Sequence, residues 1–199
     1  MPKRCFCVDI DHTLAVQLQT VNGTANPTNH LDCITISAYG KKHQYYSINT
    51  SAMGKIFAAC LKQHIDIVII TSSAYPREVV LKTLENLYCL GADSLQKCVY
   101  IDRFKYYRPG IRKAEKLNRA KQDGLISKDA QLFLLDNNDK ELAAAKEIGC
   151  TTIKAEGFPT HGEAVDNSYL IDCVQMLGLQ VHLTMLEQTR YVKRLRMRC

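Results

Sequence analysis

The sequence predicts an α/β fold with a doubly wound, mostly parallel sheet and helices on both faces. Two observations predict it. Short runs rich in aliphatic and β-branched residues recur along the chain, and such runs are typical of strands buried on both faces. Segments with apolar residues at helical spacing separate these runs. Strands that alternate with helices form parallel sheets through right-handed crossovers.

The first part of the chain predicts a strand, a hairpin and a crossover helix. Residues 5–15, CFCVDIDHTLA, begin as an apolar strand, and two acids interrupt the run near its end. A polar stretch rich in Asn, Thr and Gly then predicts a loop. Alternating segments at 33–39 and 44–48, joined by GKKH, predict a β-hairpin. Apolar residues at helical spacing predict a helix over 51–64.

The remainder repeats strand and helix. IDIVIIT at 65–71 predicts a strand buried on both faces. A helix is expected from about Pro76, whose fixed φ suits a first turn, to Leu90, with Gly91 ending it. The further predicted strands are 97–101, 131–136 and 150–155, and the further predicted helices are 111–123, 140–149 and 169–177.

Composition favours one globular domain. A chain of 199 residues with 46% hydrophobic and 23% charged residues is long enough for a core and argues against global disorder. No apolar run approaches the length of a membrane span. The N-terminus carries acids inside its apolar stretch, so it does not resemble a signal peptide.

The nine cysteines are odd in number and form no Cys-x-x-Cys pair. Most lie inside apolar runs, where they are expected as small core residues in a reducing compartment. A cytoplasmic location is therefore expected.

Basic residues are concentrated at the C-terminus. The net charge is +6, and the last ten residues, RYVKRLRMRC, hold five of the cations. Nucleic-acid binding by the fold is therefore not expected. We expect a domain over 1–180 and a basic helix over 181–199. This helix could lead to a further domain, or it could bind an acidic membrane surface or partner. The oligomeric state is left open.

Two acids at the end of the first strand stand out. Asp9 and Asp11 leave an extended chain on the same face, and paired carboxylates favour a hard cation such as Mg²⁺. Thr71 and Asp136 also fall at carboxyl ends of predicted strands. Ligands of open α/β sheets bind at that edge, so these four residues predict one site.

Residues 5–155 resemble the haloacid dehalogenase-like (HAD) phosphatases. The matching motifs are DIDHT at 9–13, the apolar strand ending in Thr71, a basic residue ahead of the last motif, and FLLDNND ending in the acids at 136 and 139. The resemblance implies a Rossmann-like HAD sheet. It also implies a Mg²⁺-dependent phosphatase that works through an aspartyl-phosphate.

The resemblance assigns roles to the motif residues. Asp9 is the expected nucleophile, and Asp11 is the expected acid and base. Thr71 is expected to hydrogen-bond a phosphoryl oxygen. Asp9, the backbone carbonyl of Asp11, and Asp136 are the expected Mg²⁺ ligands. Lys113 is the expected catalytic cation.

Two assignments stay open at the level of sequence. Lys105, Arg108 and Arg112 rival Lys113 as the basic residue of the third motif. The second metal-binding acid of the family has no clear equivalent, and either Asn137 or Asp139 could take its place.

The gaps between the motifs favour an open site. The segments 14–65 and 72–113 hold only crossover elements and a hairpin flap, and neither leaves room for a full cap domain. Capless relatives that act on phosphotyrosine make a phosphoprotein or phosphopeptide the expected substrate. The alternatives are a small sugar or nucleotide phosphate, or a catalytically silent HAD-fold binding module. A bacterial effector delivered into a host cytosol is compatible with such a chain.

Overall fold

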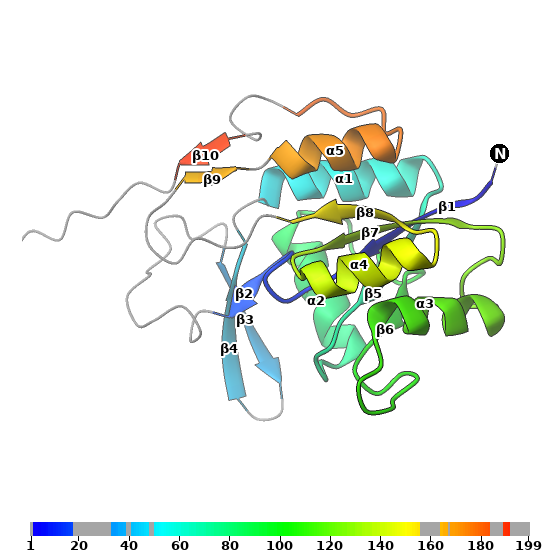
Figure 1. The fold of residues 1–199 in the computed structure, drawn as a ribbon. Helices are drawn as coiled ribbons and strands as arrows, with labels where there is room; N and C mark the ends of the chain where they lie inside the picture. The colour runs from blue at the N-terminus through cyan, green and yellow to red at the C-terminus, as the bar shows by residue number, and fades with distance from the viewer. Residues whose placement is uncertain are drawn as a thin grey trace, which may run out of the picture.

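The computed structural model of the chain has a five-stranded parallel sheet at its centre (Figure 1). The structure describes residues 2–17, 33–38, 41–47, 50–155, 164–166, 168–183 and 189–191. The strands of the central sheet are β1 (Arg4–Val8), β5 (Asp66–Ile70), β6 (Val99–Ile101), β7 (Gln131–Asp136) and β8 (Thr151–Lys154). Their order is β6-β5-β1-β7-β8, and every neighbouring pair is parallel. The predicted Rossmann-like α/β fold is therefore confirmed.

Helices cover both faces of this sheet because its strands are apolar at successive positions. In β1, Phe6 and Val8 join the core on one face, and Cys5 and Cys7 join the core on the other. The first face is covered by α1 (Thr50–Lys62), α2 (Arg77–Leu87) and α5 (Ser168–Met176). The second face is covered by α3 (Lys113–Gln122) and α4 (Asp139–Glu147). Figure 1 shows α1 and α5 side by side on one side of the sheet, and α3 and α4 on the opposite side.

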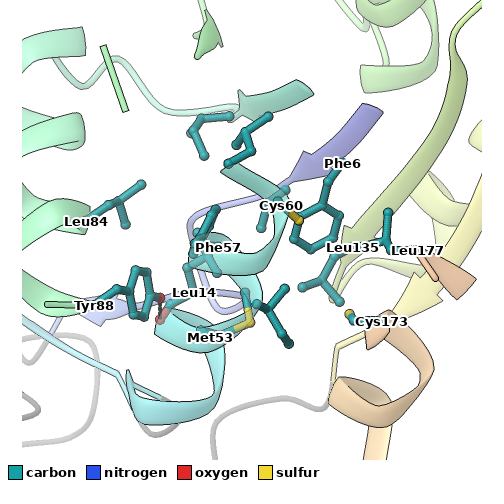
Figure 2. Close-up of a cluster of buried hydrophobic side chains, with 14 of the residues drawn as sticks. Phe6, Leu14, Met53, Phe57, Cys60, Leu84, Tyr88, Leu135, Cys173 and Leu177 are labelled. Carbon is teal, nitrogen blue, oxygen red and sulfur yellow. Dashed lines mark hydrogen bonds between the residues drawn. The ribbon is translucent and has the colours of Figure 1, made fainter. Parts of the chain in front are cut away.

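The first core also fixes the segment that follows β1. Figure 2 shows the ring of Phe57, from α1, between the rings of Phe6 and Tyr88. The ring centroids of Phe57 lie 6.2 Å from Phe6 and 5.3 Å from Tyr88. The hydroxyl of Tyr88 donates a hydrogen bond of 3.2 Å to the carbonyl of Leu14. The turn after β1, which carries the paired acids, is therefore tied to α2.

Cysteines fill core positions, as the sequence predicts. The cysteines whose side chains are described are free thiols. Cys89 is exposed, and the others are buried: Cys5, Cys7, Cys60, Cys98, Cys150 and Cys173. Burial raises the pKa of the Cys60, Cys98 and Cys150 thiols to about 12. These thiols stay protonated at neutral pH and are poor nucleophiles.

The expected hairpin is present. The strands β3 (Cys33–Ala38) and β4 (Lys41–Tyr46) are antiparallel, and β4 also pairs with β2 (Val16–Gln17). This three-stranded sheet is separate from the central one. Because β2 follows β1 so closely in sequence, the small sheet lies beyond the carboxyl end of β1 (Figure 1).

The expected basic helix over 181–199 is wrong where the structure describes that segment. Residues 181–183 have no regular structure, and β10 (Thr189–Tyr191) pairs antiparallel with β9 (Ala164–Asp166). Threonine and tyrosine suit a strand, and the ladder with β9 supplies hydrogen bonds that a local pattern does not reveal. Residues 184–188 and 192–199 lie outside the described residues. No helix among the described residues is both long enough and apolar enough to cross a membrane.

A cap domain is not found where the chain is described between the second and third motifs. Every residue from Ser72 to Arg112 is described, and this stretch holds only α2, β6 and connecting loops. Between the first and second motifs, residues 18–32 lie outside the described residues.

Gly54→Ala is expected to destabilise the protein, although alanine is the better helix former. A Cβ on Gly54, inside α1, would lie 2.6 Å from the carbonyl oxygen of Tyr88. Backbone must then move, and overpacking of this kind costs about 1–3 kcal/mol. Urea unfolding measures the loss. Ala58→Gly, on the exposed side of the same helix, measures helix propensity alone, which is about 1 kcal/mol in favour of alanine. A more stable Gly54→Ala variant would contradict the close contact.

Candidate active site

Three buried charged side chains meet at the carboxyl edge of the sheet. Asp9 directly follows β1, Asp136 ends the adjacent strand β7, and Lys113 begins α3. The ammonium nitrogen of Lys113 lies 2.6 Å from Oδ1 of Asp9 and 2.6 Å from Oδ2 of Asp136. The exposed fractions of Asp9, Lys113 and Asp136 are 3%, 5% and 0%. We call these three residues the charged cluster.

The helix start of α3 places Lys113 in this position. Its backbone N–H donates to Oε2 of Glu141, on α4, over 2.8 Å. Asp136 is held by its own loop, because Oδ1 accepts from the N–H of Asn138 over 2.8 Å. Backbone N–H groups thus fix Asp136 and the start of the helix that carries Lys113, which helps to keep the geometry of the charged cluster preorganised.

The charged cluster has more negative than positive charge. Burial raises the pKa of Asp9 to about 7; Lys113 opposes the rise, and Asp136 and Asp11 add to it. Burial lowers the pKa of Lys113, but the charges of Asp9 and Asp136 and their hydrogen bonds outweigh burial and raise it on balance. When both carboxylates are ionised, a single ammonium leaves one negative charge without a partner in the cluster. Such a site favours a further cation.

The turn after β1 fixes the position of the second carboxylate oxygen of Asp9. Oδ2 of Asp9 accepts a hydrogen bond of 3.1 Å from the hydroxyl of Thr13, and this hydroxyl accepts from the N–H of Asn137 over 3.1 Å. The N–H groups of residues 13–15 all donate to the carbonyl of Ile10. The turn contains His12, which has a positive φ of 61° and is exposed. Thr13 therefore links the loops after β1 and β7.

Asp11 lies in a separate group of hydroxyls. Its Oδ2 accepts from the hydroxyl of Thr71 over 3.2 Å and from the hydroxyl of Ser73 over 2.6 Å. Its Oδ1 accepts from the hydroxyl of Tyr75 over 2.9 Å. The strand edge thus brings Asp11 and Thr71 together, as the sequence predicts, but the Thr71 hydroxyl is directed at Asp11.

Sequence reasoning missed Ser73 and Tyr75. A signal was present, because TSSAY at 71–75 places three hydroxyl residues at alternate positions, and alternate side chains of an extended chain share one side. The pattern indicates that the three hydroxyls lie on one side of the segment. It does not indicate that Asp11, which follows another strand, faces that side.

The other three candidates for the basic residue of the third motif contact residues outside the charged cluster. The Lys105 ammonium lies 5.1 Å from the centroid of the Tyr106 ring. Arg108 pairs with Glu115 at 2.6 Å, and Arg112 lies 3.5 Å from Glu141. Lys113 alone among the four candidates contacts Asp9 and Asp136 in the described part of the chain. Its position supports the choice of Lys113, and its catalytic role stays a prediction.

The two candidates for a further metal ligand are also directed elsewhere. Oδ1 of Asn137 lies 3.3 Å from the hydroxyl of Thr13, whose one hydrogen is shared with Oδ2 of Asp9. The carboxylate of Asp139 is 84% exposed and pairs with Lys154 at 2.6 Å. In the described residues, no group of three or more His, Cys, Asp or Glu side chains is placed to hold a metal ion. A metal at this edge must therefore take ligands besides carboxylates.

Comparisons with known proteins support the fold. No protein-family model and no curated protein matches the chain. An uncharacterized protein from Corynebacterium glutamicum has a similar structure, with a TM-score of 0.50 and 13% identity over 90% of this chain and 98% of that one. A candidate 3-deoxy-D-manno-octulosonate 8-phosphate phosphatase from Vibrio cholerae has a TM-score of 0.45 and 12% identity, covering 91% of this chain and 89% of that one.

A third similar structure is a candidate HAD superfamily (subfamily III A) hydrolase from Legionella pneumophila. Its TM-score is 0.35 at 17% identity, and the match covers 71% of this chain and 59% of that one. At such identities the likeness to solved structures concerns the fold alone.

Proposed function

We propose that this protein hydrolyses phosphate monoesters with Asp9 as the nucleophile. The observation that carries the proposal is the charged cluster: a buried carboxylate at the end of the central strand, held by a buried ammonium and faced by a second carboxylate. A second acid, Asp11, stands two residues after Asp9 and is half-buried, so it lies closer to solvent. One buried acid and one accessible acid match the needs of attack and of proton transfer.

The proposed reaction has two steps. A carboxylate oxygen of Asp9 attacks phosphorus, the bond from phosphorus to the ester oxygen breaks, and Asp11 gives its proton to that oxygen. An aspartyl-phosphate remains. Asp11 then takes a proton from water, the water oxygen attacks phosphorus, and inorganic phosphate leaves Asp9 free. Lys113 holds Asp9 in place and lies near the charge that develops on the phosphoryl oxygens.

The donor set of the site fits Mg²⁺. The carboxylates of Asp9 and Asp136 and the backbone carbonyl of Asp11 would hold the ion, since Mg²⁺ prefers oxygen ligands and retains several waters. When bound, the ion offsets repulsion between Asp9 and the phosphate. The surplus negative charge of the charged cluster favours such binding. Few protein ligands are needed, so the lack of a third carboxylate is no obstacle.

A phosphorylated polypeptide is the proposed substrate class, with phosphotyrosine preferred. No folded cap is inserted between β5 and α3. The loop between β6 and α3 exposes Phe104 and Tyr107, with exposed fractions of 64% and 57%. This loop is joined to the site, because the N–H of Arg103 donates to the carbonyl of Ser73 over 3.0 Å. Exposed aromatic side chains beside a site suit an aryl phosphate and its peptide.

The test is a substrate panel. Phosphotyrosine peptides, phosphoserine peptides and metabolite phosphates are compared by kcat/KM with Mg²⁺ and again with a chelator. We expect Mg²⁺-dependent turnover that is highest for phosphotyrosine peptides, because aryl oxygen is the better leaving group and no cap is inserted between β5 and α3. If metabolites are turned over far better than every peptide, the substrate class is wrong. If no substrate is hydrolysed in either state, the chain is a binding module.

A further inference from the structure

Three hydroxyl groups converge on the carboxylate of Asp11. Thr71 and Ser73 donate to Oδ2 over 3.2 Å and 2.6 Å, and Tyr75 donates to Oδ1 over 2.9 Å. Each carboxylate oxygen therefore has at least one donor. A single hydrogen bond would let the carboxylate rotate about its terminal torsion, whereas donors on both oxygens define its plane.

The donors themselves are held by groups outside the site. The N–H of Ser73 donates to the hydroxyl oxygen of Thr71 over 3.0 Å. The carbonyl of Ser73 accepts from Arg103, and the carbonyl of Tyr75 accepts from the hydroxyl of Tyr100 over 2.7 Å. The segment 71–75 is thus fixed to β6 and to the loop after it. From this fixed backbone the hydroxyls of Ser73 and Tyr75 donate to Asp11.

We propose that Ser73 and Tyr75 are positioning residues that orient Asp11 toward the leaving-group oxygen. The inference rests on the proposed function. When the O–H bond of Asp11 breaks and a new O–H bond forms on the departing oxygen, negative charge develops on the carboxylate. Hydroxyl donors already aimed at both oxygens stabilise that charge without rearrangement. Asp11 and both donors are half-buried, so a substrate oxygen can reach the carboxylate.

The leaving group provides the decisive readout. An ester with a good leaving group, such as p-nitrophenyl phosphate, needs little proton donation, whereas phenyl and alkyl phosphates need much more. If Asp11 loses its orientation, kcat/KM should therefore fall most for esters with poorer leaving groups. A residue that merely supports the fold would lower the turnover of all esters by one common factor.

The experiment measures kcat/KM over a series of phosphate esters with increasingly basic leaving groups, with Mg²⁺ present. For Ser73→Ala and Tyr75→Phe we expect losses of about 2- to 5-fold with p-nitrophenyl phosphate and about 10- to 100-fold with alkyl phosphates, within the range of proton-transfer catalysis. Ser73→Thr keeps a hydroxyl and should recover most of the loss. Ser72→Ala removes the hydroxyl of an exposed serine in the same segment and should leave the slope of the series unchanged.

A second measurement assigns the effect to Asp11. In an Asp11→Asn background, adding Ser73→Ala or Tyr75→Phe should cause little further loss, because residues that act as a unit are not additive. This inference alone would be overturned if Ser73→Ala and Tyr75→Phe lowered kcat/KM equally for all esters. It would also be overturned if they lowered kcat/KM in the Asp11→Asn background as much as in the wild type. If the wild-type protein hydrolyses no phosphate ester, or if its turnover does not depend on Asp9, the proposed function is wrong and this inference falls with it.

Discussion

Asp9→Asn is expected to abolish phosphate-ester turnover while the fold survives. An amide cannot form the aspartyl-phosphate, and removal of a nucleophile from a catalytic unit costs on the order of 10⁴–10⁶-fold in kcat. The fold should tolerate the change. The amide oxygen can still accept from Lys113, which lies 2.6 Å from Oδ1 of Asp9, and the amide N–H can donate to the Thr13 hydroxyl. Lys113 keeps Asp136 as its ion-pair partner.

Two measurements check this expectation. Turnover of an aryl phosphate is compared between the wild type and the variant, and thermal unfolding followed by circular dichroism shows whether the variant is folded. Asp139→Asn is the matched control, because Asp139 is an exposed acid near the same edge and should retain most of the activity. A folded Asp9→Asn variant with undiminished turnover would exclude Asp9 as the nucleophile.

Lys113→Met is expected to cost both activity and stability. The substitution leaves the carboxylates of Asp9 and Asp136 facing one buried space without the ammonium that lies 2.6 Å from each. Removing one partner from a buried ionic group costs about 3–5 kcal/mol. Turnover should also fall, because Asp9 loses the group that holds it and the phosphoryl oxygens lose a nearby positive charge.

Magnesium should partly restore the stability of Lys113→Met. Without the ammonium, the two carboxylates form a stronger site for a cation, and binding to the folded state alone raises the free energy of unfolding. Urea unfolding with and without Mg²⁺ measures the difference. Lys116→Met is the matched control, because Lys116 is buried one turn later on α3 and donates to the carbonyl of Asp102 over 2.6 Å. Its stability should not depend on Mg²⁺. An equal response of both variants would argue against a metal between Asp9 and Asp136.

The central sheet was predictable because its strands are encoded locally. IDIVIIT and QLFLLD are buried on both faces, and that burial requires apolar side chains at successive positions. The placement of Asp9 and Asp136 at one edge followed from strand polarity alone. Helix ends were less predictable. The helix α2 ends at Leu87 rather than Leu90, where Cys89 takes a positive φ of 50° ahead of Gly91.

Side-chain pairing between distant segments was not predictable. The sequence offered several cations near the third motif, and only the start of α3 brings the ammonium of Lys113 between the carboxylates. The partners of Asp11 come from the segment after a different strand, so no local spacing connects them. The strand at 189–191 has a similar explanation, since it pairs with β9 at 164–166, which no local pattern connects to it, and the charged residues around it suggested a helix.

The central place of β1 also governs when the protein can fold during its synthesis. β1 leaves the ribosome before the other strands of its sheet, but one of its two partners is β7, and Arg4 pairs with Gln131. Until β7 is made, one edge of this apolar strand has no partner, and exposed edges of this kind invite aggregation. Contacts between residues so distant in sequence form slowly. The carboxylate of Asp9 can approach that of Asp136 only after β7 has been translated, so the nascent chain acquires its charged cluster late.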